Sequence, residues 1–153
     1  MMRFFDDLLN TVLALVVWSV IVMFVLYCFR LPAMHNAKIN LKKVTVKASE
    51  EYRKEISKVP AEVVQIGENY NHLMEQPTIF YALILYICIH KDPSHRDNAV
   101  IKFEAWAYVG LRIVHSIVQC FYNKIPLRFG VFLLSSLALS HIALSVFYQE
   151  IVK

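Results

Sequence analysis

The chain has 153 residues, of which 58% are hydrophobic and 18% charged, and its mean hydropathy is +0.47. A soluble domain carries about 45–50% apolar and about 25% charged residues, so the composition excludes an ordinary soluble domain and indicates an integral membrane protein. The formal net charge is only +4 and the sequence has no basic arm with interleaved aromatic residues, which argues against nucleic acid as a partner.

The first predicted span covers residues 8–29, which include no charged side chain. At about 1.5 Å per residue, a helix of this length crosses a hydrocarbon core of about 30 Å. Arg30, Leu31 and Pro32 follow, and because proline disrupts a helix interior we expect the helix to end there.

A polar stretch, residues 30–62, comes next and contains eight Lys or Arg against four Glu. This composition predicts a cytoplasmic loop that lies on the lipid head groups. Within it, residues 49–58 are expected to form a short surface helix capped by Ser49.

Three further apolar segments predict three more spans, at residues 63–89, 99–122 and 125–151. Pro77 lies inside the second of these and predicts a kink, Asn98 or Asp97 caps the third, and Pro126 suits the first turn of the fourth. The whole chain, residues 1–153, is therefore expected to form a single all-α transmembrane domain, a four-helix bundle.

The basic residues set the expected orientation. The first and third loops hold ten Lys or Arg, whereas the termini and the second loop hold four. The positive-inside rule then places both termini outside a cytoplasmic (inner) membrane.

Ionisable side chains inside the spans recur at helical spacing and are expected to meet at one depth. Glu75 lies three residues after His72, and Arg112, His115 and Gln119 form a second stripe. We expect Glu75 to pair with Arg112 and the layer, cationic on balance, to hold a small anion by guanidinium–carboxylate contacts. The members of the layer are Arg30, His72, Glu75, Arg112, His115, Gln119 and Arg128.

Two other interpretations of these residues remain. The Glu75–Arg112 pair can be a purely structural link between helices. A haem held by two of His72, His115 and His141 is less favoured, because charged neighbours would crowd an apolar macrocycle. The three cysteines have no CxxC spacing and predict buried thiols and no metal site.

Three motifs resemble the MAPEG family, the membrane-associated proteins in eicosanoid and glutathione metabolism. They are His-Leu-Met-Glu at 72–75 followed by Pro-Thr-Ile-Phe-Tyr at 77–81, Gly-Leu-Arg-Ile-Val-His at 110–115, and Asn-Lys-Ile-Pro-Leu-Arg at 123–128. The resemblance implies a homotrimer of four-helix protomers in the lipid bilayer, with glutathione between neighbouring protomers near the cytoplasmic side.

The same resemblance implies roles for the layer. Glu75 would receive the amino end of glutathione and Arg112 would pair with it. His115 and Gln119 would line the cofactor, and Arg128 would be the catalytic residue that stabilises the thiolate. Arg30 would reach across the protomer interface, and His72 occupies a position that is asparagine in glutathione-binding members.

The function expected from this resemblance is a glutathione-dependent transferase or peroxidase that acts on a lipophilic small molecule arriving through the bilayer. The alternative is a trimeric membrane binding or scaffold protein without turnover and with a degenerate glutathione site. It is favoured because Glu68 and Asn71 stand at two positions that are often arginine in glutathione-binding members.

Overall fold

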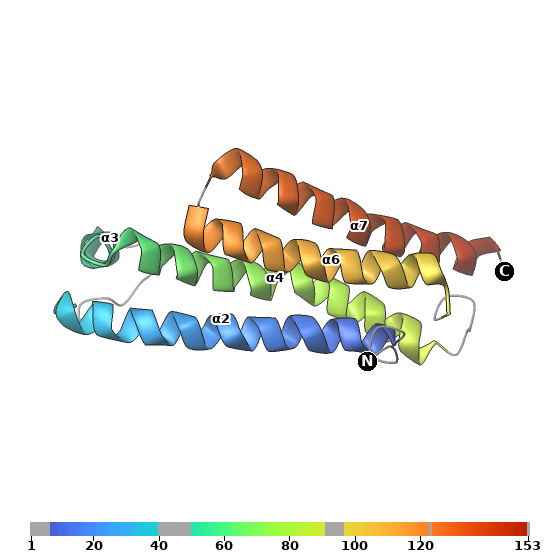
Figure 1. Cartoon of the computed structure of the whole chain (residues 1–153), viewed down its shortest axis with the longest axis horizontal. Helices are drawn as coiled ribbons and strands as arrows, with labels where there is room; N and C mark the ends of the chain where they lie inside the picture. Colours follow the sequence, from blue (N-terminus) through green and yellow to red (C-terminus); the bar gives the residue numbers. More distant parts are fainter. Residues whose placement is uncertain (1–6, 40–49, 91–96, 123, 153) are drawn as a thin grey trace.

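The computed structural model describes residues 7–39, 50–90, 97–122 and 124–152, and this part of the chain is all-α. Four long helices follow one another in alternating directions and lie side by side (Figure 1). The elements are α2 (Leu8–Asn36), α3 (Glu50–Ile56), α4 (Ala61–Ile89), α6 (Ala99–Ile117), the π-helical turn η1 (Val118–Tyr122) and α7 (Ile125–Val152). The predicted four-helix architecture and the short helix in the first loop are confirmed.

The end of α2 corrects the expectation that Pro32 stops the first helix. The helix continues through Pro32 to Asn36. It is closed by a Schellman motif, in which Lys38 adopts a positive φ of 50° and the N–H of Ile39 donates to the Met34 carbonyl over 3.3 Å. Pro32 removes only one backbone hydrogen bond from the helix. The left-handed conformation of Lys38 turns the chain off the helix axis, and this conformation determines where the helix ends.

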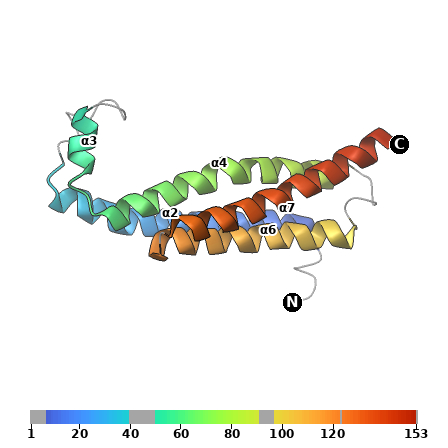
Figure 2. The same ribbon diagram turned by 90° about the horizontal axis from the view of Figure 1, so that it is seen from above.

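The other helix boundaries lie close to the predicted ones. Asp7 caps α2 by accepting from Leu9 N, and Asn98 caps α6 by accepting from Val100 N. Ser49, the expected cap of the loop helix, lies outside the described residues. Helix α4 remains one element although Pro77 lies inside it. The helix changes direction about midway along its length (Figure 2).

The surface of the bundle suits a lipid environment. Three helices, α2, α4 and α7, are long and apolar enough to cross a membrane. Large apolar side chains such as Phe24, Phe103 and Phe147 are exposed on the outside, where water would disfavour them and lipid does not. The protein is a multi-pass integral membrane protein.

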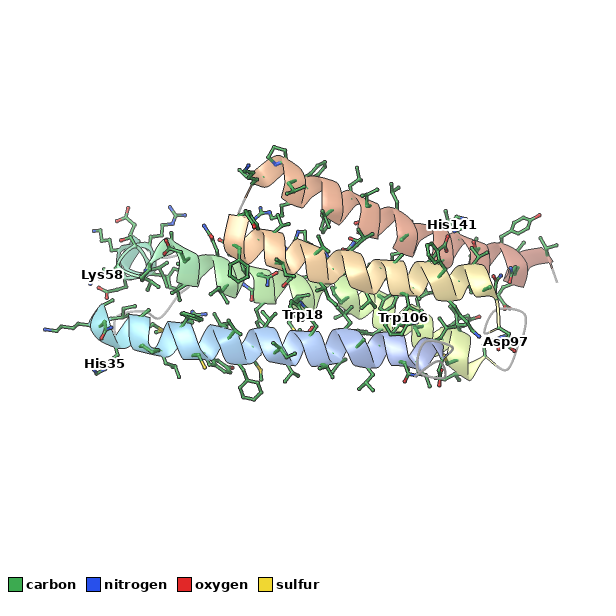
Figure 3. All side chains as sticks on the ribbon, in the orientation of Figure 1. Trp18, His35, Lys58, Asp97, Trp106 and His141 are labelled. Carbon is green, nitrogen blue, oxygen red and sulfur yellow. The ribbon has the colours of Figure 1, made fainter. Side chains whose placement is uncertain are left out.

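The helix order gathers four helix ends at one end of the bundle, which we call the basic end. It is formed by the C-terminal part of α2, the N-terminal part of α4, η1 and the N-terminal part of α7 (Figure 1). His35 and Lys58 both lie at this end (Figure 3). Within the bundle, α6 packs mainly against α7 and α2 against α4, and α4 also contacts η1 and α7. Residues on α4, on α7 and at the end of α6 can therefore meet between the helices.

Candidate functional site: a cavity lined by histidine and arginine

A cavity of about 220 Å³ lies between α4, α6 and α7, towards the basic end. Because α7 begins beside the C-terminal half of α6, Arg128 in its first turn lines the same cavity as His72 of α4 and His115 of α6. The two imidazole rings are in edge contact, with centroids 6.2 Å apart. We call this the histidine–arginine cavity, and its lining residues are His72, His115, Ile125, Arg128, Phe129 and Phe132.

Arg112 borders this cavity from the bundle interior. Its side chain is 1% exposed, and its Nη2 donates to the His72 carbonyl over 3.3 Å. The guanidinium carbon lies 5.5 Å from the ring centre of Phe132, a cation–π distance. Its Nε and Nη1 have no hydrogen-bond partner among the described residues. A buried guanidinium without a carboxylate keeps a strong capacity to attract an anion.

The predicted Glu75–Arg112 ion pair is wrong. The Glu75 carboxylate instead lies 3.6 Å from Nδ1 of His72, one turn earlier on α4, and its side chain is 72% exposed. Helical spacing placed both residues at a similar depth, but Glu75 projects from the outer face of α4 while Arg112 projects into the bundle. Spacing within one helix does not determine which face meets the neighbour.

Two other members of the predicted layer lie apart from the histidine–arginine cavity. Arg30 lines a different cavity, with Gly67, Glu68 and Asn71 of α4, so its contribution to a neighbouring copy remains a prediction. Gln119 is fully buried in η1, and neither atom of its amide has a hydrogen-bond partner among the described residues. A single chain therefore brings His72, His115, Arg128 and Arg112 together.

A buried polar cluster was missed from the sequence. Asn69 is fully buried, and its Nδ2 donates to Ser116 Oγ over 2.5 Å and to Cys120 Sγ over 3.4 Å. The cluster ties α4 to the end of α6 one turn below the cavity. A signal was available, because Ser116 stands four residues after Arg112 and so continues the inward stripe of that helix.

We expect Ser116→Ala to lower the free energy of unfolding by about 1 kcal/mol, because it leaves the buried Asn69 amide without its main acceptor. The measurement is denaturant unfolding in detergent micelles. The control is Ser140→Ala, since the exposed Ser140 hydroxyl donates only to the Ser136 carbonyl of its own helix. Equal costs for the two substitutions would contradict a structural role for the cluster.

At the opposite end of the bundle, two histidine–carboxylate contacts link α7 to its neighbours. His141 Nδ1 lies 2.6 Å from Glu104 of α6, and His90 Nδ1 lies 3.7 Å from Glu150. His141 lies towards the C-terminal half of α7, far along the bundle from the basic end (Figure 3). These contacts therefore belong to helix packing and not to the histidine–arginine cavity.

Comparison with known proteins identifies the family. No curated protein and no solved structure matches the chain significantly. The model of the MAPEG family matches residues 8–148, which include all four long helices except the last residues of α7. The resemblance predicted from the three motifs is thus confirmed over nearly the whole chain, and the protein belongs to the MAPEG family.

Proposed function

We propose that this protein is a glutathione-dependent membrane enzyme, a transferase or peroxidase that acts on a lipophilic electrophile. The observation that carries the proposal is the convergence of Arg128, His72 and His115 on one cavity with the buried Arg112 beside it. No carboxylate lines this cavity among the described residues. Such a site favours an anion, and the thiolate of glutathione is the anion that MAPEG chemistry uses.

In this proposal Arg128 is the catalytic residue. Its guanidinium would stabilise the thiolate after the thiol proton has left to water. The sulfur then attacks the electrophilic carbon, a C–S bond forms, and the displaced electron pair and a proton go to the leaving group. In the peroxidase variant the sulfur attacks a peroxide oxygen, and a second glutathione completes the disulfide as the peroxide is reduced to alcohol and water.

The size of the cavity supports a site completed by a second copy of the chain. Its volume of about 220 Å³ falls below the 300–1,000 Å³ typical of small-molecule sites. Glu75 meanwhile exposes its carboxylate on the outer face of the membrane-spanning α4, where lipid would be a poor neighbour. We infer that a homotrimer covers this face, and that Glu75 binds the amino end of the peptide there.

The remaining members of the site would hold the peptide. His72 and His115 offer ring nitrogens to a carboxylate, and Arg112 adds charge from below. Gln119 does not line the cavity and has no assigned contact with the peptide in this proposal. The role of Arg30 at a neighbour's site has the least support, since Arg30 lines another cavity.

The test is a titration of the purified protein with glutathione, followed by thiolate absorbance, together with conjugation of a lipophilic electrophile. We expect a thiolate signal at millimolar glutathione and turnover in the same preparation. Light scattering in detergent measures the oligomeric state. A trimer without a thiolate signal would overturn the enzyme and favour the alternative, a binding or scaffold protein with a degenerate glutathione site.

A further inference from the structure

A second and larger cavity, which we call the interfacial cavity, lies at the basic end between α2, α3 and α4. Its volume is about 410 Å³, within the range of small-molecule sites. Arg30, Glu68, Asn71 and Tyr52 bring polar groups to it. Apolar side chains, Val59 and Val63 among them, form the rest of the wall.

This cavity is lined by charges of both signs, and these charges do not form an ion pair with each other. Among the described residues, no carboxylate lies within ion-pair distance of Arg30 and no basic side chain lies within ion-pair distance of Glu68. Glu68 is exposed and Arg30 is half-buried. A guanidinium and a carboxylate that share a cavity without pairing are complementary to a ligand that carries both an anion and a cation.

The position of the cavity identifies the source of such a ligand. The last two turns of α2 and the first turns of α4 border it, and these are the ends of two membrane-spanning helices. His35 and Lys58 lie at the same end of the bundle (Figure 3). Basic side chains at the end of a membrane helix lie at the level of the lipid head groups.

We propose that the interfacial cavity binds the head group of a zwitterionic phospholipid that carries a primary amine. Arg30 would bind the phosphate, Glu68 would accept N–H bonds from the ammonium, and the apolar wall would cover the start of an acyl chain. A trimethylated head group has no N–H to donate, so the site would distinguish a primary amine from choline. This inference shares Arg30 with the role proposed for that residue at a neighbour's glutathione site, and apart from Arg30 it does not rest on the glutathione chemistry.

Gly67 offers a way to close the cavity without changing a charge. A Cβ at this position would lie 3.7 Å from Arg30 Nη1 and 3.7 Å from Leu26 Cδ1, which is ordinary contact. Alanine therefore fits, whereas a leucine would extend beyond these atoms towards the space that the lipid needs.

The experiment reconstitutes the full-length protein in bilayers that contain equal amounts of phosphatidylethanolamine and phosphatidylcholine. Lipids retained through detergent extraction are then quantified by native mass spectrometry. We expect the wild-type protein to retain the primary-amine lipid in preference, and Glu68→Gln to lower this preference about tenfold, because a charge-assisted contact is lost. Arg30→Gln is expected to weaken retention of both lipids, since both contain the phosphate.

The matched control is Glu62→Gln, which removes an exposed carboxylate from the first turn of the same helix but does not line the cavity. It should retain the wild-type preference. Gly67→Leu should lose lipid retention, whereas Gly67→Ala should keep it, and this pair tests the site even if a charge variant folds poorly. Soluble phosphoethanolamine competing as well as the lipid would show that a free solute is the ligand and overturn the lipid assignment.

The glutathione titration of the same variants separates this inference from the proposed function. Glu68→Gln should keep the wild-type thiolate signal while it loses lipid preference. A wild-type protein without preference between the two lipids, or a Glu68→Gln variant that keeps the preference, would overturn the lipid site whatever the glutathione result.

Discussion

Replacement of Arg128 by alanine is expected to lower the rate of glutathione conjugation by about 10²–10³-fold, the usual cost of removing one group that stabilises a reacting anion. Arg128 is the cationic residue of α7 in the histidine–arginine cavity, where His72 and His115 lie opposite. Without its charge the bound thiol would keep its proton at neutral pH. The thiolate absorbance of the glutathione complex should therefore disappear together with turnover.

The control for this prediction is Lys124→Ala. Lys124 is exposed and lies four residues before Arg128, whose N–H donates to the Lys124 carbonyl over 3.0 Å, but its side chain does not line the cavity. This variant removes a positive charge from the same end of the bundle and should keep both the thiolate signal and the rate. Equal losses in the two variants would attribute the effect to the general field of the basic end, and an unchanged Arg128→Ala variant would remove Arg128 from the chemistry.

The fold could be predicted closely because long apolar segments of the sequence indicate where its helices lie. The four long helices and the capping residue Asn98 were predicted at or near their observed positions. The end of α2 was predicted wrongly. A proline disfavours the helix only locally, and α2 continues for one more turn beyond Pro32. The Schellman motif depends on Lys38 accepting a left-handed conformation, for which a lysine gives no advance signal.

For the site, the sequence predicted only the level along the bundle at which its residues lie. Helix spacing indicated correctly that His72, Arg112, His115 and Arg128 belong to one region. It could not indicate the rotation of one helix against another, and this rotation turns Glu75 outward and separates Arg30 from the cavity. Asn69 was missed for the same reason, since a buried amide differs from an exposed one only by the neighbour that faces it.

Replacement of Arg112 by methionine is expected to stabilise the protein without ligand while it abolishes stabilisation by glutathione. Arg112 is 1% exposed, its Nη2 donates to the His72 carbonyl, and its Nε and Nη1 have no hydrogen-bond partner among the described residues. A buried charge with so little compensation costs stability, and a methionine that fills the same space removes this cost. The expected gain is about 1–4 kcal/mol, measured as a higher Tm in detergent.

The stabilisation by glutathione should change in the opposite direction to the stability without ligand. Glutathione at a hundred times its Kd should stabilise the wild-type protein by about 2.7 kcal/mol, and Arg112→Met should show no such increase, because the charge beside the histidine–arginine cavity is gone. Arg53→Met, which changes an exposed residue of α3, is the control and should leave both values unchanged. A variant with a lower Tm and an intact response to glutathione would contradict the prediction, since Arg112 would then be a structural residue whose charge is satisfied within the fold.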